Sequence, residues 1–400
     1  LLFFNQLDLQ GSDFKQAIVS TVAALIGMIP EGLVLLTSTV LAVSVTRLAK
    51  KKVLVQELYC IETLARVDVL CLDKTGTITE GKMSVDKIIP VNNHTEKEVQ
   101  EILSILGTYS EDKNSTIEAI REKFTTNKKL KVERSMPFKS SNKWSGISLK
   151  DVTYVLGAPE VIGENKKEIE KYISEYRVVA IGKSAEKLNN KLPEKIEIVG
   201  YILISDIIRK NSKEILNYFE KQGVAIKLIS GDNPITVSNI AKKAGVKDYE
   251  NYIDARTLKT EEDIKKAAIK YTIFGRVTPE QKKQIILALK EEKHTVAMTG
   301  DGVNDVLALK NADCSITVAN GSEAARNVSQ LVLLDSDFKS MPNIVDEGRR
   351  TINNIQRSAT LFLVKTIYAT MLAILFVFVN MPYPFIPIQL TLINLVVTGI

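Results

Sequence analysis

Residue types that build zinc sites and disulfide frameworks are scarce in this chain. Its 400 residues include three cysteines and two histidines. Cys60, Cys71 and Cys314 lie in or beside apolar runs, and His94 and His294 are far apart in the sequence. This distribution argues against a zinc site and indicates cysteines that are buried in a reducing compartment.

Features that indicate nucleic-acid binding are also missing. The net charge is +6, and no basic patch is interleaved with aromatic residues. A nucleic-acid partner is therefore not expected. The chain is 45% hydrophobic and 25% charged, which is typical of globular proteins, and its length is enough for about two or three domains.

Long apolar runs, in contrast, are present near both ends, at residues 17–45, 359–381 and 385–400. A run of about 20 apolar residues can span a bilayer. Basic residues flank these runs on the side of the middle region, at Arg47, Lys50, Lys51, Lys52, Arg349, Arg350 and Arg357. This bias predicts an integral membrane protein of the cell membrane, in which residues from about 47 to about 357 are cytoplasmic.

The two ends of the chain have further features. Residues 5–15 are polar and are expected to form a loop on the opposite side of the membrane, as is the turn near Pro382 and Pro384. The chain starts on Leu1 without a signal-peptide pattern and stops within an apolar run at Ile400. We therefore expect an internal section of a longer membrane protein.

The middle region alternates short apolar runs with amphipathic segments. Buried strands are expected at 67–72, 198–204, 225–229, 295–298 and 314–318, and helices at 212–222, 233–245 and 279–292. Alternation of this kind predicts an α/β fold with a doubly wound parallel sheet. Residues 82–200 are more charged and more mixed, which predicts an inserted α+β domain.

Polar residues follow the expected strands at four places, which are Asp73–Thr77, Ser230–Asp232, Val277–Lys282 and Thr299–Asp305. In an open parallel sheet, ligands bind at the carboxyl ends of the strands. We therefore expect the four segments to meet at one crevice.

Phosphoryl transfer to a carboxylate requires this kind of residue set, because the charges of the carboxylate and the phosphate must be neutralised. Mg²⁺ can do this when hard oxygen ligands hold it. Lys282 would add a fixed positive charge beside the transferred group. The Ser230 hydroxyl and the amides of Gly231 and Gly76 could donate to phosphate oxygens.

Two of these segments, Asp73–Thr79 (DKTGTIT) and Thr299–Asp305 (TGDGVND), resemble motifs of the haloacid-dehalogenase-like phosphotransferases, and more closely of the P-type ATPases. The resemblance covers nearly the whole chain. It implies an aspartyl phosphate on Asp73, with ATP and Mg²⁺ as cofactors. The implied catalytic residues are Asp73, Lys74, Thr75, Ser230, Gly231, Asp232 and Lys282, and the implied Mg²⁺ site comprises Asp73, Thr75, Asp301, Asn304 and Asp305.

The resemblance also implies a domain order. A membrane section at 1–48 precedes the first part of a phosphorylation domain at 49–81, and a nucleotide-binding domain at 82–200 follows. The second part of the phosphorylation domain occupies 201–338, and a stalk with two transmembrane helices, the last one truncated, occupies 339–400. The actuator domain of the family has no counterpart in this chain, so the remainder of the same polypeptide is an expected partner.

Thr75 lies two residues after the proposed nucleophile, where related phosphatases carry a second Asp that acts as a general acid. A threonine hydroxyl does not act as an acid near neutral pH. We therefore expect the phosphate on Asp73 to persist until another part of the protein delivers water.

The nucleotide-binding residues implied by the resemblance are Phe138, Lys143, Gly157, Arg177, Asp206 and Arg209. Phe138 would stack on adenine, Arg177 would contact phosphate, and the hinge segment from Asp206 to Arg209 would contact nucleotide. Leu156 stands where the family usually has a lysine. Glu118 is the candidate for an acidic residue near the adenine amino group.

The segment Ile29-Pro30-Glu31-Gly32-Leu33 predicts a cation site inside the membrane. Proline interrupts a helix and frees carbonyl groups, here that of Ile26. An acidic residue at membrane depth indicates function. The expected site comprises Ile26, Gly27, Ile29, Glu31 and Asn394, with Lys365 and Thr398 as further candidates. The segment resembles calcium and sodium/potassium pumps, not the heavy-metal branch with Cys-Pro-Cys.

The presence of Lys365 argues against a high-affinity site for two calcium ions. If it faces Glu31, it cancels the charge of that carboxylate, and affinity for divalent ions generally rises with ligand charge. A site for a single ion, or one with Lys365 as a counter-ion, fits better. Alternatively, Lys365 lies elsewhere on its helix and extends to the interface.

The leading functional interpretation is ATP-driven cation transport across the lipid bilayer through a phosphate on Asp73, with an inorganic cation such as Ca²⁺ as cargo. Three alternatives remain open. The chain could be part of a polyamine or lipid transporter of the same family, a soluble phosphatase, or a catalytically silent nucleotide-binding regulator.

Overall fold

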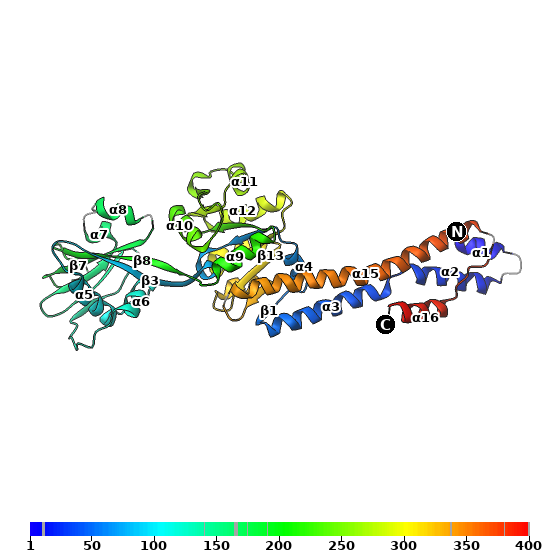
Figure 1. The fold of residues 1–400 in the computed structure, drawn as a ribbon, viewed down its shortest axis with the longest axis horizontal. Coiled ribbons are helices and arrows are strands. Elements are labelled where there is room, and N and C mark those ends of the chain that lie inside the picture. Colours follow the sequence, from blue (N-terminus) through cyan, green and yellow to red (C-terminus); the bar gives the residue numbers. More distant parts are fainter. Residues whose placement is uncertain are drawn as a thin grey trace. The chain divides into compact units, whose positions relative to one another are not determined.

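The computed structural model describes residues 1–9, 13–139, 141–163, 167–173, 175–189, 191–336, 338–379 and 381–398. These residues form two compact units (Figure 1). The first unit comprises Leu1–Arg66, Gln330–Leu334 and Ser340–Ile400, and the second comprises Val67–Ser329 and Asp335–Lys339. We call them the membrane unit and the catalytic unit.

The catalytic unit contains a parallel sheet with the strand order β13-β12-β2-β9-β11-β10. Its strands are β2 (Val69–Leu72), β9 (Ala225–Ile229), β10 (Tyr252–Asp254), β11 (Ile273–Gly275), β12 (Val296–Thr299) and β13 (Cys314–Val318). The connecting helices are α9 (Ser212–Lys221), α10 (Pro234–Ala244), α11 (Glu261–Lys270), α12 (Pro279–Glu291), α13 (Val306–Asn311) and α14 (Glu323–Val328). We call this part the parallel lobe. The predicted α/β class is confirmed.

Every residue of the central strands β2 and β12 is buried. Parallel strands with helices on both faces are apolar without alternation, which is why the short apolar runs predicted them. Cys60, Cys71 and Cys314 are buried and unbridged, as expected.

The second part of the catalytic unit is an antiparallel sheet with the order β3-β8-β7-β6-β5-β4. Its strands are β3 (Thr79–Pro90), β4 (Arg134–Met136), β5 (Trp144–Ser148), β6 (Thr153–Gly157), β7 (Arg177–Ser184) and β8 (Glu197–Ile208). Its helices are α5 (Glu96–Tyr109), α6 (Ser115–Lys123), α7 (Pro159–Ile162) and α8 (Lys167–Ile173). We call this part the antiparallel lobe.

Neighbouring residues on one strand of this lobe enter different cores. Ile181 and Ile202 pack with residues of α5 and α6, whereas Ala180 and Tyr201 pack with Trp144 in another cluster. Because successive side chains of a strand point to opposite faces, both faces of the sheet are covered.

Strand β8 corrects the prediction that 198–204 belongs with the buried strands of the parallel sheet. It pairs antiparallel with both β3 and β7. Its residues are apolar because it lies inside the antiparallel sheet, and an apolar run alone does not distinguish the two kinds of sheet. The antiparallel sheet therefore extends beyond 82–200 at both ends.

Two apolar helical stretches, Phe14–Lys50 and Phe338–Phe378, are long enough to cross a membrane, and they lie in the membrane unit apart from Phe338 and Lys339. Its helices are α1 (Leu2–Asp8), α2 (Phe14–Met28), α3 (Glu31–Lys50), α4 (Cys60–Ala65), α15 (Met341–Phe378) and α16 (Pro387–Thr398). The short strands β1 (Val53–Val55) and β14 (Leu331–Leu333) pair antiparallel.

Helix α1 corrects the expected loop at 5–15. The Asn5 side chain donates to the Val377 carbonyl at 3.1 Å, and that of Gln6 donates to the Met381 carbonyl at 3.0 Å. Gln6 also accepts a hydrogen bond from the Tyr383 amide at 2.8 Å. These polar side chains form hydrogen bonds with backbone groups at and after the end of α15. Their polarity therefore does not indicate a loop.

Helix α15 is tied to α3 and α4 by close contacts. Ser44 and Thr351 share a buried hydrogen bond of 2.6 Å, and Arg47 lies 3.3 Å from the buried Glu347. A Cβ atom at Gly348 would lie 2.5 Å from the Ile61 carbonyl oxygen. Glycine therefore allows α15 to approach α4.

Gly348→Ala is expected to lower the midpoint of thermal unfolding of the full chain in detergent by several degrees. The added methyl group meets backbone, and overpacking costs about 1–3 kcal/mol, which exceeds the gain of about 1 kcal/mol in helix propensity. The control is Asn353→Ala on an exposed position of the same helix, which should be neutral or slightly stabilising. Equal midpoints for both variants would contradict the close-contact interpretation.

Candidate functional site

The nucleophile predicted from the sequence lies at the centre of the parallel sheet. Strand β2 ends at Leu72, and its neighbours are β12 and β9. Asp73 therefore lies beside the residues that follow β12, which are Gly300 and Asp301. Helix α12 begins at Pro279 and carries Lys282 in its first turn.

Lys282 joins two buried carboxylates. Its Nζ lies 2.6 Å from Asp73 Oδ1 and 2.6 Å from Asp305 Oδ1. The exposed fraction of the three side chains is 5%, 10% and 3% for Lys282, Asp73 and Asp305. Such charges are rarely buried unless they are paired and hydrogen-bonded, so the three groups stabilise each other.

The pKa shifts in this cluster have identifiable causes. Burial raises the pKa of Asp73, and the Asp305 charge adds to this, while Lys282 opposes it. Burial alone would lower the pKa of Lys282, but the charges of Asp73 and Asp305 outweigh it and raise that pKa. Lys282 therefore keeps its proton at neutral pH.

The carboxylates of this cluster also fit a divalent cation. Oxygens of Asp73, Asp301 and Asp305 lie within 4.8 Å of one another. Burial, and then the charges of Asp73 and Asp305, raise the pKa of Asp301 to about 6. Three carboxylates with one ammonium group leave excess negative charge, and hard oxygen ligands suit Mg²⁺.

Asp305 has further contacts that restrict its role. Its Oδ1 is paired with Lys282, and its Oδ2 accepts a hydrogen bond from the Gly302 amide at 3.1 Å. It therefore positions Lys282 and the turn that carries Asp301. Asn304, predicted to support the metal, is exposed.

Gly76 allows Asp301 to approach the loop that follows Asp73. A Cβ atom at this position would lie 2.1 Å from Asp301 Oδ2, and the backbone has φ +71°. Glycine adopts this conformation at little cost, unlike other residues. The close approach explains the glycine of the Asp73–Thr77 segment.

Three other predicted catalytic residues, Thr75, Ser230 and Gly231, have different surroundings. The exposed Thr75 donates its amide to Asp73 Oδ2 at 3.0 Å. The Ser230 hydroxyl is buried and accepts a hydrogen bond from the Asp232 amide at 3.2 Å, and Gly231 is exposed.

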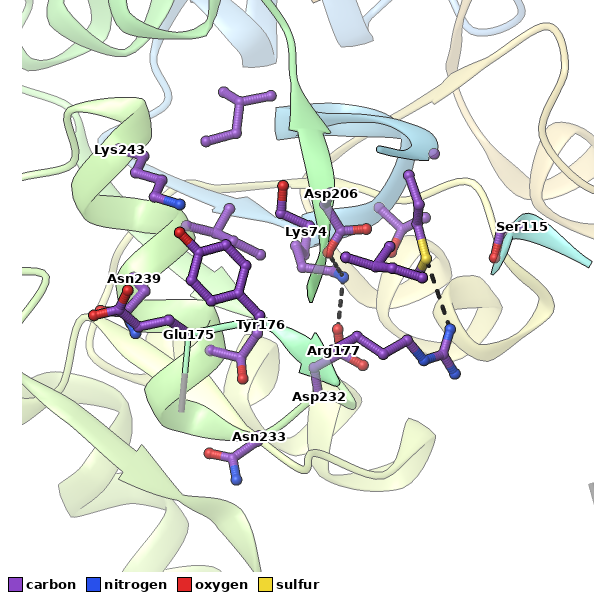
Figure 2. A pocket seen from close by; sticks show the side chains of 18 residues that line it. Lys74, Ser115, Glu175, Tyr176, Arg177, Asp206, Asp232, Asn233, Asn239 and Lys243 are labelled. Atoms are coloured by element: carbon purple, nitrogen blue, oxygen red, sulfur yellow. Dashed lines mark hydrogen bonds and ion pairs between the residues drawn. The ribbon is translucent and has the colours of Figure 1, made fainter. Parts of the chain in front are cut away.

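Lys74, predicted as catalytic, has its ammonium group paired with other carboxylates. Its Nζ lies 2.9 Å from Asp206 Oδ2 and 2.6 Å from Asp232 Oδ2, as Figure 2 shows. Arg209 donates to the Gly76 carbonyl at 2.9 Å. Asp206 and Arg209, predicted as nucleotide contacts, therefore hold the segment that follows Asp73.

The four other predicted nucleotide contacts line one cavity of about 500 Å³ in the antiparallel lobe, namely Phe138, Lys143, Gly157 and Arg177. The Phe138 ring is 40% exposed, as a stacking surface requires. Lys143 Nζ lies 3.3 Å from Glu160 Oε1, and Arg177 donates to Thr116 Oγ1 at 3.4 Å.

Two acidic residues line this cavity, Glu160 and Asp112, and the sequence did not indicate Asp112 as a nucleotide contact. Glu118, its proposed counterpart, is exposed on α6 and is not among the residues that line the cavity. Asp112 Oδ1 accepts the Phe138 amide at 2.6 Å, and Oδ2 is buried without a hydrogen-bond partner among the described residues. Asp112 lies between two helices in a segment without periodicity, so no sequence signal marks it.

The predicted cation site lies at a real interruption of the membrane helices. Helix α2 ends at Met28 and α3 begins at Glu31, as Pro30 predicted. The sequence predicts a free Ile26 carbonyl, but this carbonyl accepts a hydrogen bond from the Ile29 amide at 3.3 Å. This hydrogen bond closes the last turn of α2, and the backbone becomes extended at Ile29.

The other residues of the cation site are described in part. A Cβ atom at Gly27 would lie 3.0 Å from the Ala369 Cβ atom, so helix packing accounts for this glycine. Lys365 is half-buried on α15. The side chains of Glu31, Asn394 and Thr398 lie outside the described residues, and their role stays a prediction.

Comparisons with known proteins define the class. The family model of haloacid dehalogenase-like hydrolases matches residues 67–313. The chain is similar to the "Probable cation-transporting ATPase exp7" of Streptococcus pneumoniae, at 45% identity over 100% of this chain and 53% of that protein. It is also similar to the "Calcium-transporting ATPase CtpE" of Mycobacterium tuberculosis, at 41% identity over 94% of this chain and 48% of that protein.

Among solved structures, a zinc-transporting PIB-type ATPase in the E2.Pi state has a TM-score of 0.74 at 19% identity, over 97% of this chain and 58% of that chain. At this identity the likeness concerns the fold alone. The chain spans about half the length of the curated relatives it matches. It belongs to the haloacid dehalogenase-like hydrolase family, and the relatives it matches are named cation-transporting and calcium-transporting ATPases. The prediction of an integral membrane protein is confirmed.

Binding of Mg²⁺ is expected to weaken about fourfold between pH 7.5 and pH 5.5, because protons compete for Asp301 as the pH falls through its pKa of about 6. Calorimetric titration of the full chain with Mg²⁺ at both pH values measures this. Asp301→Asn should bind weakly, with little dependence on pH over this range. Equal affinity of the parent at both pH values would contradict the role of Asp301.

Proposed function

We propose that this chain carries the phosphorylation and nucleotide-binding parts of an ATP-driven cation pump in which Asp73 accepts the γ-phosphoryl group of ATP. The observation that carries the proposal is Lys282 between Asp73 and Asp305, at 2.6 Å from each. This arrangement combines a buried carboxylate with a fixed cation at the end of the central strand. Preorganised charge of this kind stabilises a phosphoryl-transfer transition state.

In the proposed reaction, an Asp73 carboxylate oxygen attacks the γ-phosphorus. The bond between this phosphorus and the oxygen that bridges to the β-phosphate breaks, and ADP leaves with that oxygen. Lys282 opposes the rise in the pKa of Asp73 that burial causes, and it neutralises charge on the transferred group. Mg²⁺, when held by Asp73 and Asp301, supplies further neutralisation of phosphate charge.

The phosphate on Asp73 is expected to be long-lived in this chain. Position 75 is a threonine, whose amide contacts Asp73 Oδ2. No carboxyl group is therefore present at the position that assists hydrolysis in the related phosphatases. In the complete protein, the remainder of the polypeptide would deliver water, which suits a pump because energy stays stored in the acyl phosphate during ion movement.

ATP fits the cavity of the antiparallel lobe better than a small phosphate ester does. Phe138 offers a ring face, and stacking between a base and an aromatic ring stabilises by about 1–3 kcal/mol. Asp112 Oδ2 in the cavity wall could accept a hydrogen bond from the adenine amino group. Arg177 lines the same cavity and offers a positive charge for the phosphates.

An inorganic cation is the favoured cargo, and Ca²⁺ is the leading candidate because relatives are named calcium-transporting ATPases. The helix interruption between Met28 and Glu31 supports an ion site at membrane depth. A polyamine or lipid cargo is the second candidate, because the half-buried Lys365 would reduce the negative charge available to a divalent ion. The apolar helices disfavour a soluble phosphatase, and the Lys282 ion pairs disfavour a silent regulator.

Asp73→Asn is expected to reduce phosphate incorporation from γ-labelled ATP to background, because an amide oxygen does not attack phosphorus at a useful rate. The parent should give a product that survives acid and is released by hydroxylamine. Asp86→Asn, which changes an exposed carboxylate on β3, is the matched control and should label like the parent. Full labelling of Asp73→Asn would contradict the assignment.

Lys365→Ala in the complete protein is expected to change the ion dependence of phosphorylation several-fold and to leave the ATP concentration for half-maximal labelling within about twofold. The measurement is labelling over a range of Ca²⁺, Mn²⁺, K⁺ and polyamine concentrations. The control is Lys339→Ala in the catalytic unit. Identical ion dependence in Lys365→Ala and the parent would place Lys365 away from the cargo path.

A further inference from the structure

Lys74 follows the proposed nucleophile directly, yet its ammonium group is paired with two other carboxylates. Asp206, on β8 of the antiparallel sheet, lies 2.9 Å from it, and Asp232, which follows β9 of the parallel sheet, lies 2.6 Å from it. The Lys74 side chain is only 6% exposed. One cation therefore connects carboxylates that belong to two lobes. We call these three residues the Lys74 triad.

The charges of the Lys74 triad stabilise the arrangement of the two lobes in this structure. Burial alone would lower the pKa of Lys74, but the charges of Asp232 and Asp206 outweigh it and raise that pKa. Without the lysine, two carboxylates would face each other with no cation between them. The Asp206 side chain is 14% exposed and that of Asp232 is 49% exposed, so loss of the lysine leaves mainly the charge of Asp206 uncompensated, which is unfavourable. Separation of β8 from the loop after β9 would relieve this repulsion.

Residues that follow Asp206 hold the same loop by its backbone. The Arg209 side chain donates to the Gly76 carbonyl at 2.9 Å, and the Arg209 amide donates to the Ile78 carbonyl at 3.0 Å. The Ser212 hydroxyl also donates to the Ile78 carbonyl at 3.0 Å. These contacts of the segment that leads out of the antiparallel lobe do not involve Lys74, so they hold the loop that carries Asp73 in place even when Lys74 is replaced.

Strand β3, which pairs with β8, can bend between Thr79 and Met83. The register between β3 and β8 is irregular between Thr79 and Met83. Gly81, within this interval, has φ +72° and no atom within 4 Å of its Cβ position. Irregular pairing at an open glycine allows the backbone to absorb a change in angle.

A cleft of about 440 Å³ lies at the junction of the two lobes, and the Lys74 triad lines it. Tyr176 and Arg177 enter it from the antiparallel lobe, and Lys243 enters from α10 of the parallel lobe, as Figure 2 shows. Lys243 Nζ lies 5.4 Å from the centre of the Tyr176 ring. Arg177 also lines the nucleotide cavity, so the two spaces adjoin at this residue.

We propose that Lys74 is a positioning residue, which with Asp206 and Asp232 holds the antiparallel lobe closed on the Asp73 loop, and that it is not a ligand of the transferred phosphate. This inference rests on the proposed function. It predicts that the identity of the phosphoryl donor decides whether Lys74 matters. ATP binds in the antiparallel lobe and reaches Asp73 only when the lobes are closed.

A small acyl phosphate such as acetyl phosphate requires no contact with the antiparallel lobe. In that reaction the Asp73 carboxylate attacks phosphorus, the bond between phosphorus and the acetyl oxygen breaks, and acetate leaves. Lys282, Asp301 and Mg²⁺ remain available for this step. A residue that acts through closure affects ATP alone, whereas a residue that contacts the phosphate affects both donors.

The experiment compares Lys74→Met with the parent in the full chain, using labelled ATP and labelled acetyl phosphate as donors. Labelling by ATP is expected to fall about tenfold or more at low ATP, through a raised half-saturating concentration, whereas labelling by acetyl phosphate changes less than about twofold. Lys74→Arg keeps the charge and should restore most of the reaction with ATP. Lys187→Met removes an exposed lysine that is paired with Glu133 and should change neither donor reaction.

A second variant makes the test independent of how Lys74→Met folds. Asp206→Asn should show the same dependence on the donor, and the double variant should be no worse than Lys74→Met alone, because the two residues act as one unit. Equal losses with both donors, or no loss with either, would overturn the role of Lys74. A parent that takes no phosphate from either donor would instead contradict the proposed function on which this inference rests.

Discussion

The Lys282 ammonium group between Asp73 and Asp305 is the interaction on which the rest of the site depends. The carboxylates of Asp73, Asp301 and Asp305 lie close together near the end of a buried strand. Burial and mutual repulsion oppose the ionisation of Asp73 and Asp301. A single lysine offsets part of this charge. The remaining negative charge suits a divalent cation, which would in turn neutralise charge on a phosphate. The site is thus balanced only when its ligands are present.

Each of the two lobes supplies one requirement of such chemistry. The parallel lobe holds charged groups rigidly, because strand ends and the first turn of α12 carry them. The antiparallel lobe offers a cavity with an exposed aromatic ring. The chain that enters β2 comes from α3 through β1 and α4, and within the membrane unit α3 is tied to α15 by Arg47 and Glu347. One continuous stretch of chain therefore joins Asp73 to the helices of the membrane unit.

Sequence reasoning located the charged cluster because parallel strands place their carboxyl ends at one edge, so Asp73 and Asp301 had to lie near each other. It did not find the partners of Lys74, since these depend on how two lobes meet. Asp112 gave no signal, because its role follows from a single backbone contact with Phe138. The polar residues of α1 suggest a loop in the sequence, because the hydrogen-bond partners of Gln6 lie more than 370 residues away. In each case the deciding contact is remote in sequence.

The proposed function requires that Asp73 itself becomes covalently phosphorylated. The most direct test is to incubate the full chain with ATP and Mg²⁺, quench with acid, and reduce the acyl phosphate with borohydride. This converts a phosphorylated aspartate to homoserine, which peptide mass spectrometry identifies by position. We expect homoserine at residue 73 only when ATP is supplied. Homoserine at another aspartate, or an unmodified Asp73 in a chain that has incorporated phosphate, would contradict it.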